Sequence, residues 1–514
     1  MQPISTNPLI RALIVVIPGF LLAIWLATKA GQGNLPIPLY FLIGVVALLG
    51  VKFFTKHVRL EALVLGILLF GYIVGQSGFG HFSLTTRRGI YLGEIGLMIC
   101  IAALFMRRAF TREKLVPRNN LAWSVGAFIA IGTARFLYDF RQTVDPVIVL
   151  RDFATIYYAL FYFIAFSVCR HSGSRLFLQR TLTVALIFAI FVSAVLFVDP
   201  SLFNQLLVHG RPFIEPRADL MGSFMGFACI CFFLNSQVKR HSVRWTALSF
   251  VTFIALLLPL SRATFLGFAA AVIVLMRAGQ TKFLLRLAVF GVIGIMILTP
   301  IALAVRSTAE HAYSTILRDK ILSIVQPFAS KRTFASSEGD YAAGNNEFRA
   351  VWWKSVIDET TEKSPFVGLG FGYDLAKRFL RSYGAALNVY EFDTRSPHSI
   401  LLTVYGRMGV IGILAFALIV LQILRSSLRC AAAIRRGKTS PVDIGLWCGA
   451  VGILVTSCFG VMLEGPMAAI VFWSLLGMAS CREWERLQSA PKEAVQPIRE
   501  SRLLRPAPAT SGVT

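Results

Sequence analysis

Residues 399–424 read SILLTVYGRMGVIGILAFALIVLQIL, a run in which Arg407 is the one charged residue. A helix needs roughly 20 predominantly apolar residues to cross the hydrocarbon core of a bilayer, which is about 30 Å thick. This run therefore predicts a transmembrane helix, and similar runs recur along the chain. They lie at residues 9–28, 36–54, 60–77, 89–106, 121–138, 152–169, 181–198, 218–236, 245–260, 263–277, 285–304, 399–424, 443–462 and 467–481.

The composition supports the same fold class. Of the 514 residues, 56% are hydrophobic and 15% are charged, and the mean hydropathy is +0.68, whereas soluble domains have roughly 45–50% and about 25%. These values exclude a soluble enzyme, a disordered chain and a secreted disulfide scaffold. We predict an all-α polytopic membrane protein with about 12–14 transmembrane helices.

The net charge of +25 has two explanations. In a soluble protein it would suggest a nucleic-acid partner, but in a membrane protein Lys and Arg collect in the cytoplasmic loops. The expected loops are alternately basic, for example at Arg107 and Arg108 and again at Arg435 and Arg436. This asymmetry predicts that both termini are cytoplasmic, and it removes the need for nucleic acid as a partner.

One connection is far longer than a linker needs to be, which indicates a folded extracytoplasmic loop. Amphipathic patterns predict helices in this loop at residues 315–325, 345–362 and 373–382. The predicted domains are N-terminal transmembrane helices at 1–304, a large periplasmic loop at 305–397, C-terminal transmembrane helices at 398–481 and a disordered cytoplasmic tail at 482–514.

Polar residues at the outer ends of membrane helices are costly, so each is a candidate functional residue. Guanidinium groups bind phosphate oxygens in a bidentate manner, and several arginines on one face suit a lipid-linked pyrophosphate. For Arg262, at a break between two apolar runs, an arginine snorkelling at a tight turn is an equal alternative. The outer-side candidates are Arg151, Asp152, Arg211, Arg217, Arg262, Arg349, His398 and Glu464.

Arg349 and two tryptophans are expected on one face of a loop helix, because Trp352 and Trp353 follow it by three and four residues. In one interpretation the arginine binds phosphate while the indole rings cover a sugar. In the other, the tryptophans dock the helix on the membrane surface, which is the commoner role of tryptophan at that depth.

His398 follows Pro397 and directly precedes a predicted membrane helix. An imidazole with a near-neutral pKa can accept a proton from a sugar hydroxyl, and the alternative is a histidine that caps the helix start. The sequence has no Asp-x-Asp pair, no His-Glu-x-x-His and no Walker lysine motif, so we expect neither a metal nor a cofactor. The glycines at 368, 370 and 372 predict a turn rather than a nucleotide-binding loop.

Several motifs taken in order resemble the O-antigen ligase and polysaccharide polymerase family. They are Ser261-Arg262, Arg349 with Trp352 and Trp353, PFVGLGFG at 365–372, and Pro397-His398-Ser399. Arg151-Asp152-Phe153 and Glu464-Gly465-Pro466 are similar to further segments of such proteins. The layout, with one large loop that ends at the histidine, also resembles this family, and the likeness extends from about residue 145 to residue 480.

The resemblance implies a GT-C-like fold and a glycan transferase of the bacterial inner membrane. Such an enzyme moves a saccharide from undecaprenyl pyrophosphate to an acceptor hydroxyl at the periplasmic face, without a metal. By this resemblance Arg262 and Arg349 hold the pyrophosphate, and His398 orients or deprotonates the acceptor. The expected substrate-binding residues are Arg211, Arg217, Trp352, Trp353 and Glu464, and the expected partners are the donor, an acceptor glycan or lipid, membrane lipids and polysaccharide assembly proteins.

Two residues depart from the pattern of the family. Its members commonly have Asn directly after the histidine and an acidic residue nine positions on, where this chain has Ser399 and Arg407. Both changes put the acceptor in doubt and leave open a scaffold subunit without activity. A flippase for lipid-linked oligosaccharide is the competing function, but it should line a central cavity with charges, whereas the candidates here gather at the outer face.

Overall fold

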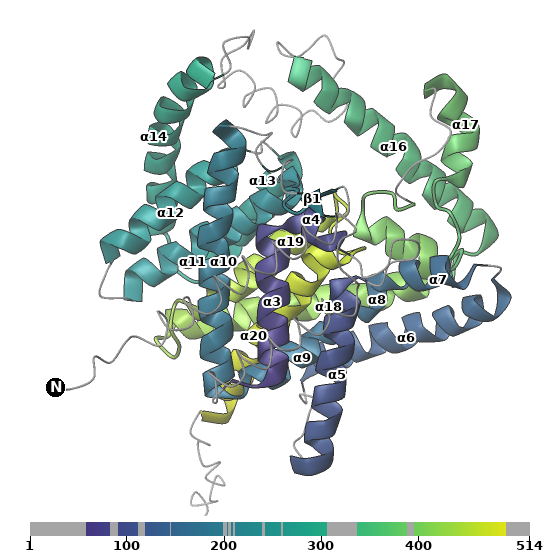
Figure 1. Cartoon of the computed structure of the whole chain (residues 1–514), viewed down its shortest axis with the longest axis horizontal. Helices are drawn as coiled ribbons and strands as arrows, with labels where there is room; N and C mark the ends of the chain where they lie inside the picture. Colours follow the sequence, from purple (N-terminus) through teal and green to yellow (C-terminus); the bar gives the residue numbers. More distant parts are fainter. Residues whose placement is uncertain are drawn as a thin grey trace, which may run out of the picture.

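The structure is a computed structural model that describes residues 58–82, 91–111, 119–143, 145–198, 203, 207–208, 211–238, 242–258, 261–305, 337–387 and 395–489. It is an almost entirely helical bundle (Figure 1), and the described residues form one sheet, an antiparallel ribbon of two two-residue strands. The elements are α3 Leu60–Val74, α4 Gln76–Gly80, α5 Leu92–Thr111, α6 Asn120–Gln142, α7 Pro146–Asp152, α8 Ala154–Tyr157, α9 Leu160–Cys169, α10 Ser172–Val198, β1 Leu207–Val208, β2 Arg211–Pro212, α11 Ala218–Val238, α12 Ser242–Leu257, α13 Arg262–Arg277, α14 Lys282–Val305, α16 Ser337–Lys363, α17 Lys377–Leu387, α18 Ile400–Arg435, α19 Asp443–Ser457 and α20 Pro466–Ser489.

The all-α prediction is confirmed. The expected runs at 9–28 and 36–54 lie outside the described residues, and every other expected run coincides with one or more helices. Within the described part of the chain, four helices are long and apolar enough to cross a membrane, namely α6, α10, α11 and α18. A fifth span results if α7–α8 and α9, which are bent by 42°, are counted together, and α3, α12 and α19 are shorter apolar helices.

The run expected as one helix over 152–169 is instead broken into short pieces. Between α7 and α9 the backbone tightens, with i→i+3 hydrogen bonds such as Ile156 N–H to Phe153 O at 2.9 Å and Ala159 N–H to Ile156 O at 3.0 Å. Such tight turns are typical of a break between helices. Tyr157 and Tyr158 lie here, and both hydroxyls donate to one oxygen of Glu94, at 2.8 and 2.7 Å.

Helix α20 lies at the centre of the bundle, packed against α9, α19 and α3. Its Trp473 is buried, as are Trp447 of α19 and Tyr162 of α9. The helix continues to Ser489, into the segment expected as tail, because its polar end is held by other helices. Arg482 pairs with Asp443 of α19 at 3.0 Å, and Glu485 pairs with Arg175 of α10 at 2.5 Å. Residues 490–514 lie outside the described part.

The large loop contains α16 and α17, which lie together at one edge of the bundle (Figure 1). They overlap the helices expected at 345–362 and 373–382, while the one expected at 315–325 lies outside the described residues. A small apolar cluster joins the two helices and the segment between them, with members Trp352, Val356, Leu375, Ala376 and Phe379. The loop therefore has a core of its own.

The loop is joined to the bundle at a break in α18. Gly409 has φ 60° and ψ −155°, which interrupts the helical hydrogen bonds around it. The backbone N–H groups just after the break donate to loop carbonyls, Val410 to Pro365 O at 2.9 Å and Ile411 to Phe366 O at 3.1 Å. Because unpaired backbone groups are costly away from water, the loop completes the hydrogen bonding of this helix.

Glycine is required on both sides of this junction. Gly368 has φ 72°, and a Cβ there would lie 2.5 Å from the carbonyl carbon of Arg407. A Cβ on Gly409 would lie 2.4 Å from the carbonyl carbon of Phe366. The expected turn at 368–372 is thus confirmed, and the absence of side chains allows two backbones to touch.

Candidate functional site

His398 lies where the large loop meets α18, two residues before the first residue of that helix. Its φ of 57° is a left-handed conformation, which costs a non-glycine residue roughly 1–2 kcal/mol. Two tryptophans of α16 contact this segment: the Trp353 indole N–H donates to Pro397 O at 2.6 Å, and the Trp352 ring centroid lies 5.6 Å from that of the imidazole. Such strain persists where surrounding contacts hold it.

Burial and two nearby arginines lower the pKa of His398 from 6.5 to about 4. Burial is the largest cause, followed by the positive charges of Arg349 and Arg217. Because the imidazole is then neutral at ordinary pH, one of its ring nitrogens is available to accept a proton.

Arg349 connects the loop helix α16 to the end of the bundle. Its Nη1 donates to Phe459 O, in the connection between α19 and α20, at 2.7 Å. The ring of Trp353 lies 6.3 Å from the ring of the same phenylalanine. Arg349 is therefore held between two segments that are far apart in the sequence, and its charge acts on His398.

Arg262 is the first residue of α13, directly after Ser261. The start of this helix is fixed by two hydroxyl contacts: Thr264 donates to Asp219 O at 3.2 Å, and Thr456 donates to Ala263 O at 3.3 Å. Arg262 is close enough to Arg349 for their charges to repel each other. The positive end of the α13 dipole adds to this charge.

Arg217 lies directly before α11, where its backbone N–H donates to Gln76 Oε1 at 2.9 Å. Its guanidinium is 3.4 Å from the Asp219 carboxylate. Because Thr264 bonds to Asp219, the starts of α11 and α13 lie together. Arg211 belongs to strand β2, and its side chain lies outside the described part.

Glu464 lies between α19 and α20 and faces the start of α18. Its Oε1 accepts a hydrogen bond from the Thr403 hydroxyl at 2.8 Å, while Oε2 is buried and has no hydrogen-bond partner among the described residues. Burial raises the pKa of this carboxyl to about 7, against the opposing effects of the Ser396 and Thr403 hydroxyls and of Arg217. A proton is thus available here near neutral pH.

Comparison with known families gives one match, over the segment that contains three of these residues. Residues 247–417 match the model of the O-antigen ligase family. This segment is therefore similar to O-antigen ligases. Enzymes of the ligase and polymerase type make up this family, and their substrates are lipid-linked glycans. No curated protein matches the chain.

The matched segment holds Arg262, Arg349 and His398, whereas Arg217 and Glu464 come from outside it. The charges of Arg349 and Arg217 reach His398, and that of Arg217 reaches Glu464. The candidate site residues thus come from the starts of α11, α13 and α18, from α16 and from the α19–α20 connection. Among the described residues, no group of three or more His, Cys, Asp or Glu side chains is arranged to hold a metal ion.

The two tryptophans of the matched segment differ in their surroundings. Trp352 is 1% exposed and belongs to the apolar cluster of the loop, where its indole N–H donates to Leu375 O at 3.1 Å. Trp353 is partly exposed and contacts Pro397 and Phe459. Helical spacing alone could not separate the two, because both positions lie near the same face.

The two departures from the family pattern have different structural settings. Ser399 is buried at the N-cap of α18, but its side chain makes no capping hydrogen bond. Arg407 is buried inside the same helix and pairs with Asp152 at 2.9 Å. The sequence singles out Asp152 and Arg407 separately, but their pairing and the role of Arg395 were not predicted, because no local pattern connects residues so far apart in the chain.

Proposed function

We propose that this protein transfers a glycan from undecaprenyl pyrophosphate to an acceptor hydroxyl, at the periplasmic face of the bacterial inner membrane and without a metal. The observation that carries the proposal is the meeting of arginines from separate elements around one neutral histidine. Arg349 acts on both Arg262 and His398, and Arg217 acts on His398 and Glu464.

The arginines supply the chemistry of a pyrophosphate site. Like charges brought close together repel, and a doubly charged anion between them would relieve this repulsion. Arginine remains charged and binds phosphate oxygens with two parallel hydrogen bonds. The start of α13 adds its dipole, which favours an anion at the position of Arg262. These groups would stabilise the negative charge that develops on the leaving pyrophosphate.

His398 provides a base for the acceptor. Its low pKa keeps the imidazole neutral, so it can take the proton of a sugar hydroxyl as that oxygen attacks the anomeric carbon. The bond from this carbon to the pyrophosphate oxygen breaks in the same step. Glu464, with a pKa near 7, lies across the start of α18 and can hydrogen-bond the acceptor sugar in either protonation state.

The test uses the purified full-length protein in detergent, with EDTA and with undecaprenyl-pyrophosphate glycans extracted from the host. Products are followed by gel electrophoresis and mass spectrometry, with and without lipid A core. Wild-type protein should join glycans, whereas Arg262→Gln and Arg349→Gln should each lose about 100-fold or more of kcat/KM. Arg378→Gln, on the exposed side of the loop, is the control and should remain fully active.

The products distinguish a polymerase, a ligase and a flippase. Longer lipid-linked chains would identify a polymerase, and products that need lipid A core would identify a ligase. If no acceptor yields a product while the same lipid crosses liposome membranes faster, the protein is a flippase and the proposal is wrong.

The proposal also fixes an orientation. The large loop must face the periplasm, where the glycans are displayed, and both termini are then cytoplasmic. The basic residues at the ends of α5 and α18, such as Arg107 and Arg435, agree with this, since such residues gather on the cytoplasmic side. The test places Lys354→Cys or Arg436→Cys in a variant whose eight native cysteines are replaced by serine. An impermeant maleimide should label the first from the periplasm and the second only after the cells are lysed.

A further inference from the structure

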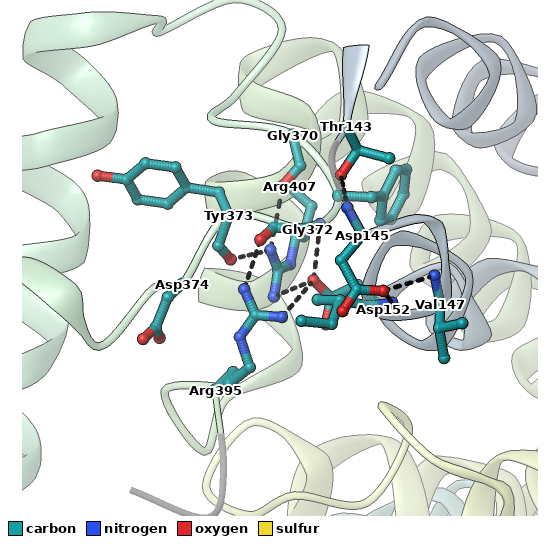
Figure 2. A network of polar contacts seen from close by, with 12 residues as sticks. Thr143, Asp145, Val147, Asp152, Gly370, Gly372, Tyr373, Asp374, Arg395 and Arg407 are labelled. Carbon is teal, nitrogen blue, oxygen red and sulfur yellow. Dashed lines mark hydrogen bonds and ion pairs between the residues drawn. The ribbon is translucent and has the colours of Figure 1, made fainter. Parts of the chain in front are cut away.

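We propose that Arg407, Asp152 and Arg395 form a latch that holds His398 in its working position, so that Arg407 and Arg395 are positioning residues. This inference rests on the proposed function for the role of His398, but the latch itself can be tested without substrate. Figure 2 shows the guanidinium groups of Arg407 and Arg395 converging on the Asp152 carboxylate.

The first part of the latch is the glycine turn of the loop. Arg407 Nη1 donates to Gly370 O at 3.1 Å and also to Tyr373 O. From the other side, Asp152 Oδ2 accepts the Gly372 N–H at 2.8 Å. The turn is therefore held through its carbonyls by a cation and through its amide by an anion, and both ions are largely buried.

A second carboxylate reinforces the turn from α6. Asp139 Oδ2 accepts the Phe371 N–H at 2.7 Å and pairs with Arg135 at 3.0 Å. The rings of Phe371 and Phe153 lie 5.6 Å apart and close the contact on the apolar side. The turn thus binds to α6, α7 and α18 at once.

The second part of the latch is Arg395, three residues before His398. Its Nη2 donates to Gly372 O at 2.5 Å, and its Nη1 lies 3.6 Å from Asp152 Oδ2. Arg395 and the Trp353–Pro397 hydrogen bond restrain one side of His398, while α18 restrains the other. Because His398 has the left-handed φ of 57°, releasing one side lets its backbone return to an ordinary conformation and moves the imidazole.

The shape of arginine explains why this residue lies inside a membrane helix. Arg407 is 3% exposed and contacts three acceptors in different directions: one carboxylate and two carbonyls. A planar fork with five N–H donors can do this, whereas the single ammonium of lysine cannot hold the same three acceptors in that geometry. The positive charge that departs from the family pattern therefore has its counter-charge in Asp152.

The test measures how fast diethyl pyrocarbonate modifies His398, peptide by peptide, in the full-length protein between pH 5 and pH 8. Only a neutral imidazole reacts. With a pKa of about 4 the wild-type rate at pH 5 should be about 90% of its value at pH 8, whereas a pKa restored to 6.5 would leave about 3%. Arg407→Lys and Arg395→Gln should both move the profile towards the second value.

Glycan transfer provides the second measurement. Both variants should lower kcat by about 10- to 100-fold, because the base is misplaced, while the KM for the lipid-linked donor stays within about twofold. Arg378→Gln is the matched control, since it removes an arginine–carboxylate pair of the same loop that does not contact the turn. Its profile and its kcat should both equal those of the wild type.

The outcomes are distinguishable. If Arg407→Lys does not fold, the half-exposed Arg395→Gln decides, because it leaves the buried pair intact. A wild-type pH profile in a folded Arg395→Gln variant would overturn the latch. If the profile shifts but the wild-type protein joins no glycans, the latch on His398 is supported while the proposed function fails.

Discussion

The junction between the loop and α18 depends on Gly409, so we predict that Gly409→Ala destabilises the protein strongly. The residue has φ 60° and ψ −155°, a conformation that is essentially restricted to glycine. Its Cβ would lie 2.4–2.5 Å from three backbone atoms of Pro365 and Phe366. Backbone atoms cannot move aside as the end of a side chain can, so the loop must withdraw.

The size of the effect follows from two contributions. Forcing alanine into this backbone conformation costs about 1–3 kcal/mol. Withdrawal of the loop breaks the hydrogen bonds from Val410 to Pro365 and from Ile411 to Phe366, at about 1 kcal/mol each. The total is about 3–5 kcal/mol, which is a large part of the 5–15 kcal/mol that typically stabilises a folded domain.

A matched control separates the steric clash of a Cβ at residue 409 from the cost of a positive φ for alanine. Gly437 also has a positive φ, of 67°, but a Cβ there meets nothing within 4 Å. Gly437→Ala should therefore cost only about 1–2 kcal/mol. The assay is the free energy of unfolding, by titration of detergent-solubilised protein with SDS. Equal losses for the two variants would refute the docking of the loop on α18.

Three further predictions concern the site. Trp353→Phe removes the donor to Pro397 O and should lower kcat about fivefold, for about 1 kcal/mol, in the glycan-transfer assay; an unchanged kcat would show that this contact does not hold His398. Glu464 has a folded pKa of about 7, above its ordinary 4.5, so the folded state binds the extra proton. Its contribution to stability is present below about pH 4.5 and is lost as the pH rises through 7. Between pH 5 and 8 the wild type should lose about 2.5 kcal/mol of unfolding free energy that Glu464→Gln does not lose, and parallel curves for the two proteins would contradict the assignment. Transfer should also continue in EDTA, and a strict requirement for one divalent metal would exclude the metal-free mechanism.

The sequence predicted the features that depend on local composition. Lipid demands long apolar helices, so runs such as 218–236 and 399–424 became helices at the expected places. The resemblance singled out Arg262, Arg349 and His398, and in the structure the charge of Arg349 acts on both Arg262 and His398.

Features that depend on distant partners were not predictable in this way. The helix break at Gly409 exists because loop carbonyls replace the missing helical partners, and no pattern within 399–424 shows those carbonyls. Arg407 departs from the family pattern, and no local pattern shows that Asp152, which lies in a different part of the chain, balances its charge. Trp352 was predicted to bind substrate from its spacing to Arg349. That spacing does not reveal the small apolar cluster that buries it.

The junction at Gly409 also bears on how such proteins can be recombined. Because loop and helix recognise each other through main-chain atoms, the side chains of Pro365 and Phe366 are not what makes the fit. A chimera that carries the loop of a related protein should therefore retain function only if the C-terminal junction of the transferred segment lies beyond Ile411. The transferred loop then keeps the start of α18, whose backbone amides donate to the loop carbonyls. Crossovers placed at His398 would separate the two halves of one hydrogen-bonded unit.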